Sequence, residues 1–268
     1  MARRLGILLV CALLLAGCSA LGGAGGGSDR FETVTPVPVQ EPDPDAGTST
    51  FPPGITRSGI DDLDRLTTNH LHAIANRSYV WTEWSRMREV RVNESNVVVT
   101  RSERMVVESP TVYNHSLDRI RYTVAGTQRL RRSTYADGRE WHQRTVDESR
   151  TSYTAGTIST DRDQFAFAAT FVIEQYFSAE NTSVTRIRDA SGTVYRVQND
   201  DPGQYGEYWS DYSAVMYVEP SGFVRRLTVS YDIDRENGTD HVAYRFGYEQ
   251  RGGVTTSPPS WLDRADGE

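Results

Sequence analysis

The chain has no lysine, only two cysteines and no known enzyme signature. All 29 basic residues are arginine, and the formal net charge of -7 leaves no general positive field that would hold nucleic acid. We therefore expect no nucleic-acid partner. The G-x-S-x-G, H-E-x-x-H and P-loop patterns do not occur in the sequence. We predict no catalytic residue, no cofactor and no metal site, and we expect that the protein is not an enzyme.

Long hydrophobic runs are also missing, and the most apolar stretch lies at the N-terminus. Two arginines precede an apolar run from Leu5 to Leu15, which is shorter than the roughly 20 residues of a transmembrane helix. This order is typical of a secretory signal peptide. Cleavage between Gly17 and Cys18 would remove Cys11 and leave Cys18 without a disulfide partner. The alternative is an uncleaved signal anchor in which Cys18 is a small packed residue.

The stretch Leu15-Ala16-Gly17-Cys18 resembles the lipobox of secreted lipoproteins, in which the chain is cut before the cysteine and its thiol carries a lipid. The resemblance implies that Cys18 becomes the N-terminus and inserts its lipid in the cell membrane, on the extracytoplasmic face. Residues 1–17 are then a lipoprotein signal peptide. Residues 18–57 are rich in Gly, Pro and Thr and predict a disordered tether. Residues 58–268 remain as one domain.

The pattern within residues 58–268 predicts an α+β domain. Apolar residues recur at helical spacing from Ile60 to Ile74, after a capping box formed by Ser58 and Asp61. From residue 79 a period of two predicts half-buried antiparallel strands, which short turns join into a meander. The apolar runs are Ile120, Tyr122 and Val124; Leu227, Val229, Tyr231 and Ile233; and Val242, Tyr244, Phe246 and Tyr248. The turn signals are Asp137-Gly138, Ser191-Gly192, Pro220-Ser221-Gly222 and Asn237-Gly238.

A second helix is predicted to interrupt the strands. Thr160 and Asp163 have capping spacing, and the run QFAFAATFVIEQYFSAE that follows is apolar on more than one face. One interpretation is a core helix between the sheet and loops. The other is that part of the helix lines a cavity for an apolar small molecule or a lipid. The predicted cavity residues are Phe165, Phe167, Phe171, Val172 and Tyr176.

Three groups of polar residues imitate functional sites. His70 and His72 lie two apart on a predicted helix, point in different directions and cannot bind one metal ion together. Glu140 and His142 share a strand face, which we interpret as a surface pair. Residues 232–240 resemble a calcium loop, but their glycine is one place late and the Asn-Gly pair explains them as a hairpin turn.

Two further features bear on the setting of the protein. Aromatic rings are concentrated between residues 205 and 217, which suits the rim of a lipid cavity, a sugar-contacting surface or packing over a sheet edge. These residues are Tyr205, Tyr208, Trp209, Tyr212 and Tyr217. In an exported protein, N-x-[ST] sequons are possible glycosylation sites. They begin at Asn76, Asn93, Asn114, Asn181 and Asn237.

The order of helix, antiparallel strands, apolar helix and further strands resembles the LolA/LppX-like lipoprotein-carrier fold. That resemblance implies a curved antiparallel half-barrel covered by the two helices and able to hold lipid. The lipobox, the acidic tether and the stretches TYADGREWHQR, VEPSGFVRRLTVSY and PPSWL resemble a haloarchaeal family of secreted lipoproteins of unknown function. The resemblance spans residues 59 to 262 and transfers no ligand residue. It implies a carrier of an apolar ligand; the alternative is a non-catalytic envelope module that contacts proteins or glycans.

Overall fold

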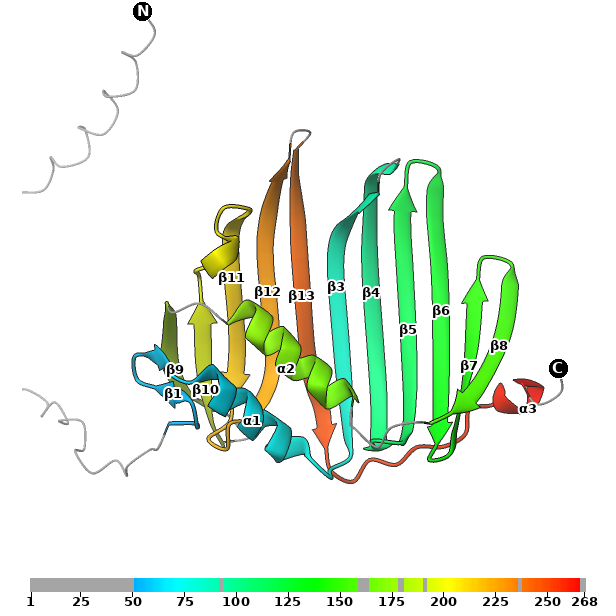
Figure 1. Ribbon diagram of the computed structural model, residues 1–268, viewed down its shortest axis with the longest axis horizontal. Coiled ribbons are helices and arrows are strands. Elements are labelled where there is room, and N and C mark those ends of the chain that lie inside the picture. The colour runs from blue at the N-terminus through cyan, green and yellow to red at the C-terminus, as the bar shows by residue number, and fades with distance from the viewer. Residues whose placement is uncertain are drawn as a thin grey trace, which may run out of the picture. The chain divides into compact units, whose positions relative to one another are not determined.

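The computed structural model describes residues 51–265, apart from 92–93, 159–163, 178–180, 190–191 and 236–237 (Figure 1). The predictions for Cys18, the signal peptide and most of the tether lie outside the described residues. The compact unit extends from Ser49 to Glu268 and so starts before residue 58, where the tether was predicted to end. The reason is that Phe51 packs on Tyr195 with ring centroids 5.3 Å apart, while Ile55 is buried in the core.

The unit contains a short two-stranded hairpin, eleven longer strands and a few helices. The first half of the unit contains β1 (Ile55–Thr56), β2 (Gly59–Ile60), α1 (Leu63–Ile74), β3 (Tyr79–Arg91), β4 (Glu94–Ser109), β5 (Val112–Thr123), β6 (Gly126–Asp137), β7 (Glu140–Asp147) and β8 (Arg150–Thr157). The second half contains α2 (Gln164–Tyr176), β9 (Thr182–Asp189), β10 (Gly192–Asn199), a 3-10 turn (Gly203–Tyr205), β11 (Trp209–Val218), β12 (Val224–Arg235), β13 (Gly238–Arg251) and α3 (Leu262–Ala265). Among the residues that the structure describes, no helix is long and apolar enough to cross a membrane.

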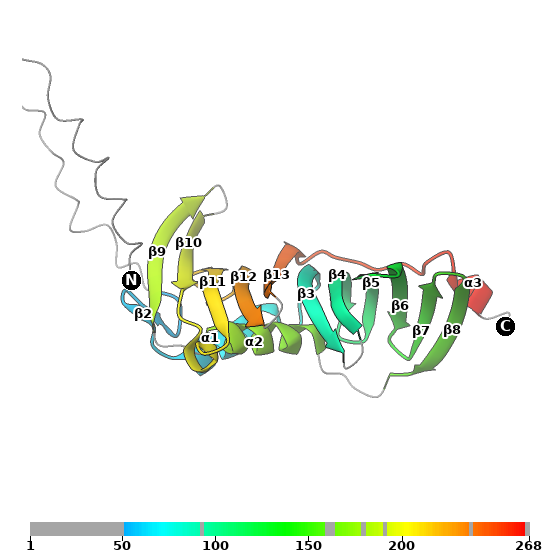
Figure 2. The ribbon, with the colours of Figure 1, turned by 90° about the horizontal axis from the view of Figure 1, so that it is seen from above.

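The eleven long strands form one open antiparallel sheet in the order β8-β7-β6-β5-β4-β3-β13-β12-β11-β10-β9. The predicted α+β class with a curved antiparallel sheet is confirmed (Figure 2). The sheet consists of two meanders, β3 to β8 and β9 to β13. They meet where β3 pairs with β13, with Tyr79 opposite Arg251. The first and last long strands of the chain are therefore neighbours at the centre of the sheet, and β8 and β9 are its edges.

Helices α1 and α2 lie on the same face of the sheet, which we call the helix-side face (Figure 2). Phe165 at the start of α2 contacts Tyr113 and His115 of β5, with ring centroids 5.1 and 5.6 Å apart. Tyr176 at its end lies near Tyr231 of β12, at 6.4 Å. Since paired residues share a face and successive residues alternate, the helix-side face carries the odd residues of β4 and β5 and the even residues of β6.

The core lies between the two helices and the strands they cover. Leu66 of α1, Ile173 of α2, Trp81 of β3 and Leu227 of β12 are all at most 1% exposed. The alternating runs of β12 and β13 face this core, as predicted. Strands β6 to β8 lie beyond the helices, and most of their described residues are half-buried or exposed. The sheet thus has a helix-covered half and an open half.

The run Ile120, Tyr122 and Val124 does not belong to a core face, contrary to its pattern. Tyr122 is 44% exposed because the even residues of β5 lie on the face opposite the helices, and Val124 is 92% exposed because it lies in the turn after β5. Phe165 packs on the odd residues of this strand instead. The odd positions include Arg119 and Arg121.

The start of α1 also differs from the prediction. Its N-cap is Asp62, whose carboxylate accepts a hydrogen bond of 2.8 Å from the Arg65 amide. Ser58 does not cap the helix, because the short β1–β2 hairpin occupies residues 55 to 60. The predicted turn at Asp137-Gly138 is confirmed, and Gly138 adopts a φ of 101° that only glycine accepts readily. The predicted cap of α2 by Thr160 and Asp163 lies outside the described residues.

The segment after β13 runs along the opposite face of the sheet and ends at α3 (Figure 2). The Val254 amide donates a hydrogen bond to Ser78 Oγ at 2.9 Å, and the Thr256 amide donates to Glu108 Oε2 at 2.8 Å. Trp261 lies 6.4 Å from the Tyr153 ring of β8. The helix-side face of the open half therefore stays free of this segment.

Candidate functional site

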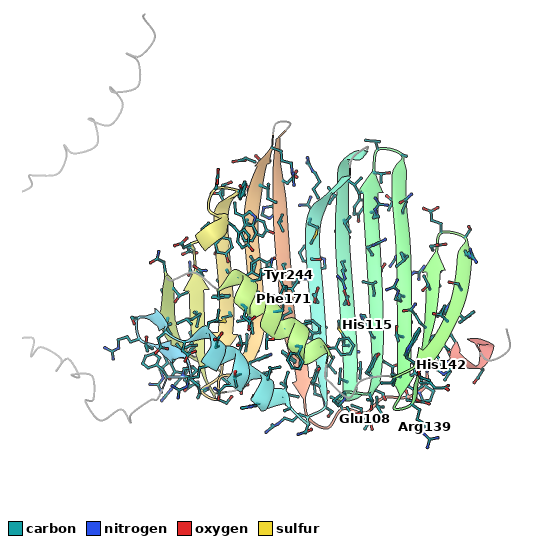
Figure 3. The ribbon with its side chains drawn as sticks, in the orientation of Figure 1. Glu108, His115, Arg139, His142, Phe171 and Tyr244 are labelled. Carbon is teal, nitrogen blue, oxygen red and sulfur yellow. The ribbon has the colours of Figure 1, made fainter. Side chains whose placement is uncertain are left out.

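Helix α2 carries all five predicted cavity residues, but it divides them between two sides. Phe165 and Tyr176 are each 8% exposed and face the sheet, and Val172 packs at the margin of the core. Phe167 and Phe171 are 43% and 68% exposed and lie on the outer side of the helix. Figure 3 shows Phe171 on α2 and His115 on β5 near the start of that helix. The five residues do not line a single cavity.

The outer phenylalanines line a groove between α1 and α2. Its volume is about 650 Å³. Leu71 of α1 and the two phenylalanines provide its apolar surface. The remaining lining residues are polar: Asp64, Thr67, Thr68, Thr170 and Glu174. Phe171 is the more exposed of the two phenylalanines, and exposed apolar surface of this kind is typical of sites that bind a ligand or a partner.

Two hydrogen bonds fix the C-terminal end of α2 to the sheet. The hydroxyl of Tyr212 donates to the Tyr176 carbonyl at 2.6 Å, and the side-chain amide of Asn199 donates to the same oxygen at 3.0 Å. A helix ends with carbonyl groups that lack intrahelical partners, so both bonds satisfy an acceptor that is buried here. The end of α2 is therefore held in place, while its outer side stays open.

A pair of carboxyl groups lies on the helix-side face next to α2. Glu83 of β3 and Glu103 of β4 are directly opposite each other in the register. Glu103 is 3% exposed, accepts a hydrogen bond of 2.6 Å from His115 Nε2 and forms an ion pair with Arg101. Burial alone would raise the pKa of Glu103, but the His115 hydrogen bond and the Arg101 charge lower it below its usual value. Burial and the neighbouring Glu103 charge raise the pKa of Glu83.

Tyrosines and a tryptophan surround the inner end of this site. Burial raises the pKa of the Tyr176, Tyr231 and Tyr244 hydroxyls, which therefore stay protonated. Trp209 stacks on Tyr231 with ring centroids 4.1 Å apart and 22° between the planes. Figure 3 shows Tyr244 on β13 beneath α2. The site thus combines one carboxyl group with a lowered pKa, one with a raised pKa and several phenol hydroxyls beside apolar rings.

The two glutamates are not among the site residues predicted from the sequence. A signal was present, because Glu103 alternates with Met105 and Val107 in β4 and both of these are buried. The opposition of Glu83 and Glu103 had no such signal, since it depends on the register between two strands.

The predicted aromatic patch is partly assembled by the fold. Trp209 stacks on Tyr205 and Tyr212, with centroid distances of 4.4 and 5.9 Å. Tyr208 is 63% exposed and lies outside this stack. Tyr217 instead lies beneath the guanidinium of Arg226, at 4.1 Å. Three of the five rings therefore belong to one stack, which packs against the helix-covered sheet.

The polar groups that imitate functional sites have structural partners. His70 is buried, and its Nδ1 accepts a hydrogen bond of 3.1 Å from the Val224 amide. His72 is exposed on the same helix. On β7, His142 Nε2 lies 3.8 Å from Glu140 Oε2. No cluster of three or more His, Cys, Asp or Glu side chains with the geometry of a metal site occurs among the described residues.

Three of the five predicted sequons lie in the described part of the chain. Asn76 is exposed after α1, with a φ of 57°. The side-chain amide of Asn114 donates a hydrogen bond to the Ser257 carbonyl at 3.1 Å, and the side-chain amide of Asn181 donates to Asp201 Oδ2 at 2.7 Å. Asn93 and Asn237 lie outside the described residues. Each of the Asn114 and Asn181 side-chain amides thus already donates one hydrogen bond from the nitrogen that would carry a glycan.

Comparison with known proteins finds no family model and no curated sequence that matches the chain. Among solved structures, LprF from Mycobacterium bovis is 9% identical over 75% of this chain and 98% of its own, with a TM-score of 0.37. A beta-barrel-like protein of the domain of unknown function DUF1849 from Brucella abortus is 9% identical over 69% of this chain and 100% of its own, with a TM-score of 0.26. At such scores the likeness does not establish a shared fold or function.

Proposed function

We propose that this protein is a membrane-anchored extracytoplasmic lipoprotein whose folded domain binds an apolar or amphipathic ligand along α2. One observation carries the proposal: α2 is apolar on both sides, yet only its inner side is buried. Phe167 and Phe171 remain exposed beside Leu71 in a groove of about 650 Å³. A helix that only filled the core would gain nothing from phenylalanine on its outer side.

Exposed phenylalanine side chains forgo the free energy that burial would provide. Burying a phenylalanine side chain contributes about 1.5–3 kcal/mol relative to leaving it in water. Phe171 forgoes most of this gain, since it is 68% exposed. A ligand chain that covers the groove would recover it. The acidic residues Asp64 and Glu174 at the rim would favour a neutral or cationic group at that end of the groove.

The test uses the whole chain with Cys18→Ser, so that a covalent lipid does not interfere. The protein is secreted from a salt-adapted host, purified in high salt and extracted with organic solvent, and the extract is analysed by mass spectrometry. We expect a stoichiometric apolar ligand, and less of it after Phe171→Ser. Val124→Ser is the matched control, because Val124 is 92% exposed but lies at the β5–β6 turn. A stable protein without any extractable ligand would contradict the proposal.

The anchor is tested separately. Cys18→Ser is expected to release the protein from the membrane fraction into the medium, because the thiol that carries the lipid is lost. Unchanged membrane retention of this variant would show that the anchor is not a lipid on Cys18.

The second candidate is a non-catalytic envelope module that contacts proteins or glycans. The open half of the sheet favours it, because α1 and α2 do not cover the helix-side face of β6 to β8 and β8 forms one edge of the sheet. Crosslinking on intact cells from cysteines introduced on β8 would identify a specific partner if this candidate is correct. A protein that crosslinks to nothing and carries bound lipid would favour the first candidate.

A further inference from the structure

Four arginines lie close together on the helix-side face of the open half, although the chain as a whole is acidic. Arg101 of β4, Arg119 and Arg121 of β5, and Arg132 of β6 all occupy helix-side positions. The register gives this directly, since Arg101 is opposite Arg119 and Arg132 is opposite Leu117. The chain as a whole has a formal net charge of -7.

These arginine side chains lie close enough together to contact the same anionic group. Directly opposite residues have Cβ atoms about 5 Å apart, and diagonal neighbours about 7–8 Å. Arg119 is therefore at the centre, with Arg101 directly opposite, Arg132 on the diagonal and Arg121 two residues further along the strand. Like charges that face each other across strands destabilise a sheet unless an opposite charge lies between them.

The buried carboxylate on this part of the face, Glu103, has partners other than Arg119. Glu103 pairs with Arg101 and with His115. Arg119 Nε is buried and has no hydrogen-bond partner among the described residues. Arg121 donates a hydrogen bond of 3.2 Å to Gln128 Oε1. The Arg119 guanidinium therefore keeps unused donor capacity, and its side chain also lines a pocket that an anion can enter.

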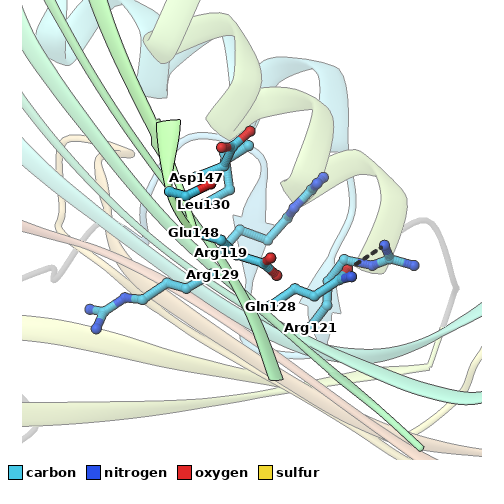
Figure 4. A pocket seen from close by; sticks show the side chains of 8 residues that line it. Arg119, Arg121, Gln128, Arg129, Leu130, Asp147 and Glu148 are labelled. Atoms are coloured by element: carbon cyan, nitrogen blue, oxygen red, sulfur yellow. Dashed lines mark hydrogen bonds between the residues drawn. The ribbon is translucent and has the colours of Figure 1, made fainter. Parts of the chain in front are cut away.

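A pocket opens at the Arg119 and Arg121 end of this cluster (Figure 4). It has a volume of about 330 Å³, and Arg119, Arg121, Gln128 and Leu130 contribute to its wall. Asp147, Glu148, Ser149 and Arg129 complete the lining. Figure 4 shows the Arg121–Gln128 hydrogen bond within this wall. Leu130 provides an apolar surface next to the guanidinium groups, so the pocket is amphipathic.

The polarity changes along β5 toward α2. The helix-side residues run from Arg121 and Arg119 through Leu117 to His115 and Tyr113, and the last two rings contact Phe165. Tyr113 is buried under Phe165, so with about 3.4 Å per residue the accessible strip from His115 to Arg121 is roughly 20 Å long. One end is cationic and the other is aromatic and adjoins the apolar helix. An amphiphile of similar length has the same polarity along its axis.

We propose that the arginine cluster binds the phosphate headgroup of an amphipathic lipid, whose chain extends along β5 toward α2. This inference rests on the proposed function and names the ligand class. A phosphate offers several oxygens to several guanidinium forks, whereas a single carboxylate would be satisfied by one arginine. The acidic Asp147 and Glu148 at the pocket rim would disfavour a ligand with more than one anionic group at that side.

The experiment measures binding to the Cys18→Ser chain by titration calorimetry with three probes: dihexanoyl phosphatidic acid, dihexanoyl glycerol and inorganic phosphate. We expect phosphatidic acid to bind roughly tenfold more tightly than dihexanoyl glycerol, which lacks the phosphate. Arg119→Gln and Arg132→Gln should each weaken phosphatidic acid about tenfold and leave dihexanoyl glycerol unchanged.

Arg131→Gln is the matched control, because Arg131 neighbours Arg132 on β6 but lies on the opposite face, paired with Asp118. It should change neither affinity. Thermal unfolding of each variant checks that the fold is retained, and the loss of a like charge at Arg119 should not lower the midpoint.

The outcomes separate the two proposals. Equal binding of both lipids, unaffected by Arg119→Gln, would overturn the headgroup site and leave apolar ligand binding intact. Binding of neither lipid would overturn both. Binding of inorganic phosphate alone, weakened by Arg119→Gln, would show an anion site for a free phosphate and would overturn the lipid assignment.

Discussion

The buried histidine of α1 gives a stability that depends on pH in a calculable way. His70 is fully buried, stacks on Phe223 and accepts a hydrogen bond from the Val224 amide. Burial, with a contribution from the positive charge of Arg251, lowers the pKa of His70 from 6.5 to about 3. The native state therefore keeps this imidazole neutral in the range where the unfolded state protonates it.

The dependence of the free energy of unfolding on pH follows from the difference in proton binding between the native and unfolded states. Above pH 6.5 both states hold His70 neutral, so its titration has no effect on the free energy of unfolding. As the pH falls below 6.5, the unfolded state takes up a proton that the native state does not, and stability is lost until the pH reaches about 3. At about pH 5 the loss amounts to roughly 2 kcal/mol, since each pH unit contributes about 1.4 kcal/mol.

The assay is urea unfolding of the Cys18→Ser chain at about pH 7.5 and about pH 5. His70→Asn retains an acceptor for the Val224 amide but does not titrate, so its stability should fall by about 2 kcal/mol less between the two pH values than that of the parent. His72→Asn, at an exposed position of the same helix, should keep the parental loss. If His70→Asn and the parent lose the same amount, His70 is not the source of the pH dependence.

Three further substitutions test other parts of the fold by urea unfolding. Gly54→Ala should cost roughly 2–3 kcal/mol, because Gly54 has a φ of 79° and a Cβ there would lie 2.1 Å from the Asp62 carbonyl oxygen; an unchanged midpoint would refute this. Asp240→Asn should cost about 3 kcal/mol, since its fully buried carboxylate pairs with two arginines, and a neutral effect would mean that these pairs only offset their desolvation. Tyr212→Phe should cost about 1 kcal/mol through the lost bond to the Tyr176 carbonyl, and no loss would show that Asn199 suffices.

The sequence predicts those parts of the fold that local chemistry determines. Alternation in β12 and β13 identified residues that face the core, such as Leu227 and Phe246, because both strands lie under the helices. The Asp-Gly signal identified the turn between β6 and β7, where the backbone needs a positive φ. These features depend on residues that are neighbours in the chain.

Other features depend on which surface the helices cover, and the pattern does not contain this information. Alternation in β5 predicts two different faces, but it does not say that Phe165 packs on the side of His115 and leaves Tyr122 exposed. The same limit applies to the candidate sites. Arg119 stands out only when the register places it opposite Arg101, with a buried nitrogen that has no hydrogen-bond partner in the part of the chain that the structure describes.

The pairing of β3 with β13 determines when the domain can complete its folding. Every other pair of neighbours in the sheet is consecutive in the chain, so each can form locally as a hairpin or across one short connection. Tyr79 meets Arg251 only after nearly all of the domain has been synthesised and, if exported unfolded, translocated. Such long-range pairing slows folding, because the entropy of closing the loop is lost before its contacts form.

A chain that stops before Gly238 would therefore present four sheet edges, β8, β3, β12 and β9, instead of two. Unpaired edges are templates for aggregation and targets for proteases. Only a chain that includes β13 can therefore join the two half-sheets and pair the β3 and β12 edges at the centre.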